Sequence, residues 1–108
     1  MSEVKWEKEG DTVRIRLIGD IGVKIDHLMT IQDRVDLLTI NPPEHVIFDL
    51  KEVNMLTSSG LSLIMRAYKR SERKGRRFEI VNTPPEILNI FRMTGLLNVL
   101  QVSPLLDE

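Results

Sequence analysis

"HVIFDLKEVNMLTSSGLSLIMRAYKRSERKG", residues 45–75, joins a short apolar run to a longer amphipathic segment and indicates the fold of the whole chain. Residues 45–50 are rich in β-forming side chains and nearly all apolar, as a central strand covered on both faces would be. The apolar residues after the hydroxyl cluster recur at helical spacing: Leu61, Ile64, Met65 and Tyr68. With Gly75 as its end signal, this pattern predicts a helix that starts at Ser58 or Ser59 and runs to about residue 74.

The residues before this stretch predict a hairpin and then a helix. Apolar and charged side chains alternate over residues 4–17 around the turn-forming pair Gly10-Asp11, which indicates two strands with one solvated face. From Ile25 onward, the residues assigned to the apolar side of a helix are Leu28, Met29, Val35 and Leu38. The Pro42-Pro43 pair must end that helix, because proline cannot continue it.

The residues after this stretch predict a strand, a helix and a last strand. "RRFEIV", residues 76–81, is typical of a strand, and "TPPE", residues 83–86, predicts a helix start with Thr83 as its cap. Gly95 would end that helix, and "LNVLQV", residues 97–102, reads as a short final strand.

The resulting order, β-β-α-β-α-β-α-β, predicts an α/β fold. Strands that alternate with helices favour parallel crossovers, so we expect a mixed, mostly parallel sheet of about five strands with three to four helices packed on it. A chain of 108 residues fits a single domain, with its core at about residues 12–102.

Composition and charge argue against several classes of partner. A formal net charge of −1 gives no global field that would attract nucleic acid or an acidic membrane surface. Cysteine is absent, which excludes disulfides and thiolate chemistry and fits a reducing compartment. No apolar run approaches the roughly 18 residues needed to cross a bilayer. We therefore expect a cytoplasmic protein without membrane insertion or direct nucleic-acid binding.

The sequence argues against an enzyme and against a metal or nucleotide site. A nucleophile elbow needs Gly-x-Ser-x-Gly and a histidine base, whereas Ser58 lies in Leu-Thr-Ser-Ser-Gly and His45 opens the far end of the preceding strand. His27 and His45 are isolated, so neither fits a metal-ligand pattern. The glycines in residues 18–24 match no phosphate-binding motif.

A basic run follows the hydroxyl cluster and consists of Arg66, Lys69, Arg70, Arg73, Lys74, Arg76 and Arg77. Cations are favoured near the carboxyl end of a helix, so a solvated helix face is the simpler interpretation. An acidic protein partner or RNA is the alternative, although the few aromatic residues argue against base stacking.

Three adjacent hydroxyls, Thr57, Ser58 and Ser59, precede the second predicted helix. One of them is explained as a helix cap worth about 1 kcal/mol. Three exceed what a cap needs, and the carboxyl end of a central strand is where open α/β sheets carry functional residues. A phosphate here would face the positive end of the helix dipole, so it would change the surface without unfolding the domain.

The sequence resembles a STAS domain of the bacterial anti-sigma factor antagonist type. The resemblance covers about Val13 to Val102 and rests on the strand "VIFDL", on the "SSGL" that opens the long helix, and on the later "RMTGLLNVL". It implies a bacterial signalling protein that regulates transcription by partner switching. Its partner would be an anti-sigma factor that is also a serine kinase, with a phosphatase to reverse the modification. The protein would need no cofactor of its own.

The resemblance also implies a phosphorylated serine and a binding face. By position in the motif the phosphoacceptor is Ser58, with Thr57 as second choice. The implied partner contacts are Ile21, Gly22, Thr57, Ser58, Ser59, Leu61 and Ser62. Two positions depart from the usual pattern: Thr57 replaces a frequent Asp, and in Gly19-Asp20-Ile21-Gly22 the acidic residue is shifted.

The two departures leave alternatives to the antagonist. One is a STAS scaffold that does not switch, either in a signalling complex or beside a membrane transport system. The other, from a different class, is an enzyme acting through Ser58, which a serine-reactive probe would label.

Overall fold

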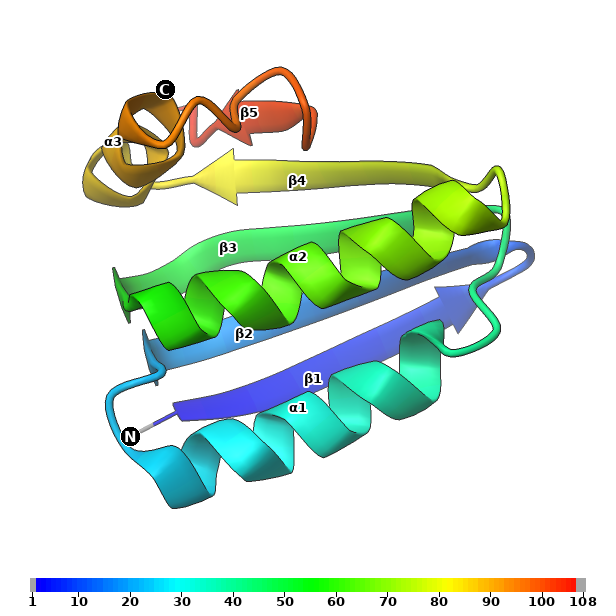
Figure 1. The fold of residues 1–108 in the computed structure, drawn as a ribbon, viewed down its shortest axis with the longest axis horizontal. Helices are drawn as coiled ribbons and strands as arrows, with labels where there is room; N and C mark the ends of the chain where they lie inside the picture. The colour runs from blue at the N-terminus through cyan, green and yellow to red at the C-terminus, as the bar shows by residue number, and fades with distance from the viewer. Residues whose placement is uncertain (1, 107–108) are drawn as a thin grey trace.

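The computed structural model describes residues 2–106, which form one five-stranded sheet and three helices. The elements in chain order are β1 (Ser2–Glu9), β2 (Thr12–Ile21), α1 (Ile25–Thr39), β3 (His45–Leu56), α2 (Ser58–Arg73), β4 (Arg77–Thr83), α3 (Pro85–Met93) and β5 (Val102–Pro104). The strands lie in sequence order across the sheet (Figure 1). β1 is antiparallel to β2, and every later neighbour is parallel. The predicted α/β class and element order are confirmed.

The main core lies between the sheet and the helices. Strand β2 alternates partly exposed and buried side chains along its whole length, with Val13, Ile15 and Leu17 buried. On β3 and β4 the buried aromatic pair Phe48 and Phe78 continues the same layer, with ring centroids 5.6 Å apart. Strands β2 and β3 end side by side, at Ile21 and Leu56, and the segments that follow these two ends form the candidate functional site.

The prediction that the central strand is covered on both faces is wrong. Val46, Phe48 and Leu50 of β3 are fully buried, whereas His45 and Ile47, which point to the other side, are partly exposed. Parallel strands added in sequence order, with right-handed crossovers, place their connecting helices on the same face. The opposite face of the sheet therefore carries polar side chains beside a few apolar ones.

One carboxylate on that opposite face is nevertheless buried. Asp49 accepts hydrogen bonds from the Arg14 guanidinium at 2.7 Å, the Lys51 backbone N–H at 3.0 Å and the Asn82 amide at 3.2 Å. Burial alone would raise the pKa of Asp49, but these bonds outweigh it and hold the pKa below its ordinary value of 3.8. The network links β2, β3 and β4.

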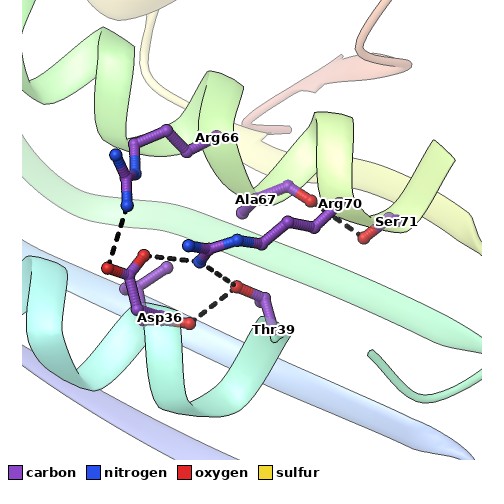
Figure 2. A network of polar contacts seen from close by, with 7 residues as sticks. Asp36, Thr39, Arg66, Ala67, Arg70 and Ser71 are labelled. Carbon is purple, nitrogen blue, oxygen red and sulfur yellow. Dashed lines mark hydrogen bonds and ion pairs between the residues drawn. The ribbon is translucent and has the colours of Figure 1, made fainter. Parts of the chain in front are cut away.

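A second ionic cluster joins the two long helices. Figure 2 shows Asp36 of α1 facing two arginines of α2. Arg70 Nη1 lies 2.5 Å from one Asp36 oxygen, and Arg66 Nη2 lies 3.1 Å from the other. Arg70 also reaches the buried Thr39 hydroxyl, at 3.5 Å. This contact fixes α1 beside α2 on the covered face of the sheet.

Three local predictions need correction. Met29 is exposed, because it lies off the buried stripe of α1, which instead includes Ile31. Thr83 does not cap α3: it ends β4 with its side chain buried, and Pro84 takes the cap position without a side-chain hydrogen bond. Residues 97–101 form a turn rather than a strand, because Leu100 N–H bonds back to the Leu96 carbonyl, so β5 begins only at Val102.

Candidate functional site

The amino end of α2 is tied to the end of β2 by Thr57. The Thr57 side-chain oxygen accepts a hydrogen bond from Gly60 N–H at 3.2 Å and so caps the helix. The same hydroxyl donates to the Ile21 carbonyl at 3.3 Å, and the Thr57 backbone N–H donates to that carbonyl at 3.1 Å. A carboxylate at position 57 could accept the first bond but has no proton for the second. Threonine therefore fits this position through both roles.

Two glycines allow the two chain segments to touch. A Cβ on Gly22 would lie 1.9 Å from Thr57 Oγ1, and Gly22 has a φ of +95°. A Cβ on Gly60 would lie 2.7 Å from the Ile21 carbonyl oxygen. Since neither distance leaves room for a side chain, the loop after β2 and the first turn of α2 form one closely packed unit.

Ser58 and Ser59 lie on the outside of this unit, and both are exposed. The first turn of α2 contains no acidic side chain. Because the amino end of a helix carries partial positive charge, an anion on either hydroxyl would be favoured there. Ser62, one turn further along and also exposed, donates its hydroxyl to the Ser58 carbonyl at 3.0 Å.

The seven residues named as partner contacts lie close together in the structure, but not all of them have an exposed side chain. Ile21 is completely buried, so its side chain is not part of the exposed surface, and its role as a partner contact stays a prediction. Its carbonyl instead positions Thr57. Leu61 is partly buried against the core, and Gly22 is partly exposed. Ser58, Ser59 and Ser62 remain as the exposed polar surface.

Two exposed apolar residues beside this surface were missed by the sequence analysis. Val23 follows Gly22 directly, Ile25 begins α1 two residues later, and the two are 52% and 74% exposed. Ile25 was named only as the residue from which this helix begins, and it lies off the buried stripe that starts at Leu28. Its position off that stripe on a helical wheel is the signal that could have identified it. The rim of the site is therefore partly apolar.

The two histidines lie in β3 and α1, outside the segment that carries the three hydroxyls. His45 is at the opposite end of β3 from Ser58, where its Nε2 lies 2.5 Å from Glu79 Oε2. His27 is partly exposed in α1. Within residues 2–106 no three side chains of the metal-ligating acidic, histidine or cysteine types gather at one place. No helix in that range is long and apolar enough to cross a membrane.

The basic run divides into paired and exposed members. Arg66 and Arg70 contact Asp36, as described above. Lys69, Arg73 and Lys74 are exposed at the carboxyl half of α2 and just beyond it. This distribution matches the solvated helix face that the sequence favoured.

The STAS domain family model matches residues 4–108. The anti-sigma F factor antagonist of Paenibacillus polymyxa is 22% identical over 100 residues, which cover 93% of this chain and 85% of that protein.

Two solved structures show the same fold. An anti-sigma factor antagonist from Mycobacterium paratuberculosis has a TM-score of 0.82 at 21% identity, with 99% of this chain and 89% of that chain covered. The Bacillus cell fate determinant SpoIIAA in its phosphorylated form has a TM-score of 0.75 at 19% identity, with 97% and 93% covered. The resemblance seen in the sequence is thereby confirmed, and the chain belongs to the STAS domain family.

Proposed function

We propose that this chain is an anti-sigma factor antagonist: a non-enzymatic regulator of transcription that binds an anti-sigma factor and leaves it when Ser58 is phosphorylated. In this proposal residues 1–108 act as one STAS module, and the anti-sigma factor supplies the serine kinase activity. The relatives named as anti-sigma factor antagonists support the partner class. The solved structure of SpoIIAA in its phosphorylated form supports the switch.

The observation that carries the proposal is the exposed Ser58 hydroxyl at the amino end of α2. A kinase needs a free hydroxyl, and Ser58 is exposed, whereas the Thr57 hydroxyl is engaged in two hydrogen bonds. Phosphorylating Thr57 would break its contact with Ile21 and would crowd Gly22. These contacts favour Ser58 over Thr57 as the acceptor.

Phosphate on Ser58 would act on the partner rather than on the fold. It would add about −1.5 to −2 charge at neutral pH beside the positive end of α2, where a negative charge stabilises the helix. On the partner face, the same charge must lose water when the complex forms, and it repels acidic groups. The free energy of binding therefore becomes less favourable while the domain stays folded.

Binding to the anti-sigma factor encoded in the source genome tests this proposal. Ser58→Ala should bind as the unmodified protein does, and Ser58→Asp should bind at least about tenfold more weakly. Ser103→Asp makes the same change in charge at the exposed strand β5 and should leave binding unchanged. Equal binding by Ser58→Asp and Ser58→Ala would refute the switch and favour a STAS scaffold that does not switch.

A further inference from the structure

The two edges of the sheet are protected to different degrees. β5 forms one edge with only three residues, and one of them is Pro104, which lacks the N–H needed for pairing. β1 forms the other edge with eight residues and no proline (Figure 1). An unpaired edge of this length is a template for a further strand unless its side chains prevent pairing.

The side chains of β1 alternate between the two faces of the sheet. Val4 and Trp6 pair with the buried residues Leu17 and Ile15 of β2, so they lie on the face that the helices cover. The odd-numbered positions lie on the opposite face, and in order they are Glu3, Lys5, Glu7 and Glu9. Acidic and basic residues therefore alternate at the centre of this edge.

We propose that β1 pairs in antiparallel fashion with β1 of a second copy of this chain, around a two-fold axis at Trp6. A two-fold axis normal to the sheet leaves the side chains of both copies on the same face as before. Odd-numbered residues of one copy therefore lie opposite odd-numbered residues of the other. With Trp6 opposite Trp6, Lys5 of each copy lies opposite Glu7 of the other. The only like charges that meet are Glu3 and Glu9 at the solvated ends.

The charge pattern favours this register over its neighbours. A shift of the axis by one residue places Lys5 opposite Lys5 or Glu7 opposite Glu7, and like charges directly opposite are destabilising. A shift by two residues toward the amino end brings Glu3 opposite Lys5 but shortens the paired segment. Lysine and glutamate on an edge ordinarily discourage pairing, but their alternation here makes the strand complementary to itself.

The covered face adds apolar area to the same contact. Trp6 is 41% exposed, with the Arg34 guanidinium 4.5 Å from its ring centroid. A groove between β1 and α1 is lined by Val4 and Trp6 on one side and by Arg34 and Leu37 on the other. Leu37 is 69% exposed. The proposed axis places both α1 helices on one side of the joined sheet, so this groove faces its copy.

Sedimentation equilibrium of the full chain at rising concentration tests the proposal. The unmodified chain should dimerise, and Lys5→Glu should raise the dissociation constant by about tenfold or more, because both ionic pairs become repulsive. Lys5→Glu places an acid beside Arg16 of β2 and so should not harm folding. Lys69→Glu on the exposed side of α2 makes the same change in net charge and should leave the dissociation constant unchanged.

Mixing two variants gives the sharpest result. Lys5→Glu carries acids at positions 5 and 7, and Glu7→Lys carries lysines at both, so each should be monomeric alone and the mixture should form a heterodimer. Trp6 is the sole tryptophan, so its emission should shift to shorter wavelength on association. A chain that stays monomeric at about 0.5 mM would overturn the proposal, because even a weak dimer with a dissociation constant of about 0.1 mM would then be largely associated. The proposal would also be overturned by dimers whose dissociation constant changes neither with Lys5→Glu nor on mixing the two variants. It would be overturned as well if β1 paired only with an extended segment of another protein.

Discussion

Replacement of Gly22 by alanine tests whether the loop after β2 and the start of α2 form one unit. Gly22 has a φ of +95°, and an added Cβ would lie 1.9 Å from Thr57 Oγ1 and 2.8 Å from Gly60 N. Both of those atoms belong to the cap of α2. The substitution should therefore force the Thr57 side chain away and break the cap as well as strain the backbone.

The expected cost is the sum of two effects. The backbone conformation costs an L-residue about 1–2 kcal/mol. Loss of the threonine cap costs about 1 kcal/mol more. Gly22→Ala should therefore lower the free energy of unfolding by roughly 2–3 kcal/mol. Gly75→Ala is the matched control, because Gly75 has a φ of +67° but nothing within 4 Å of an added Cβ. It should show the backbone cost alone.

Urea unfolding followed by circular dichroism at 222 nm measures both variants. A second pair of proteins isolates the cap: in a Thr57→Ala background, from which the Oγ1 atom is missing, Gly22→Ala should cost less than in the unmodified chain. Equal losses for Gly22→Ala and Gly75→Ala, with no dependence on position 57, would refute the close packing described for this site.

Four further variants test the ionic contacts and the proposed phosphorylation site. Asp49→Asn should lower the free energy of unfolding by about 2 kcal/mol at pH 7. Folding lowers the pKa of Asp49, so the stability that its carboxylate contributes is fully present above the ordinary pKa of 3.8. This contribution is lost as the pH falls through the lower pKa of the folded state. The free energy of unfolding of Asp49→Asn should therefore change less with pH over this acid range. Arg70→Ala should cost about 1 kcal/mol and Arg66→Ala less, since Arg66 is the more exposed partner of Asp36, with added salt reducing both losses in thermal unfolding. Ser58→Asp should raise stability by about 0.5 kcal/mol in urea, and a loss instead would mean that a charge at this position disturbs the fold itself.

Much of the fold could be predicted because its local signals agree with one another. The alternation in β2, the helical stripe of α2 and the glycines after α2 and α3 all point to the elements that form. The errors arose where tertiary contacts override the local signal. Thr83 stands in a capping sequence, but its side chain is buried at the end of β4. Residues 97–101 are rich in apolar side chains, but they form a turn in which Leu100 is buried in the core.

The site could be predicted only in part. The position of Ser58 follows from the strand-helix pattern, since the carboxyl end of a buried strand and the amino end of a helix must meet there. The burial of Ile21 and the double role of Thr57 depend on β2 and β3 ending side by side, which no local pattern contains. The exposure of Val23 likewise depends on where the loop leaves the sheet.

Mass spectrometry after incubation with the cognate anti-sigma factor, ATP and magnesium tests the central claim most directly. The proposal predicts one phosphoryl group, localised by fragment ions to Ser58, and release of the modified protein from its partner. Ser58→Ala should remain unmodified under the same conditions while still binding. An unmodified chain, or a phosphate on Thr57 or Ser59 with binding unchanged, would contradict the account.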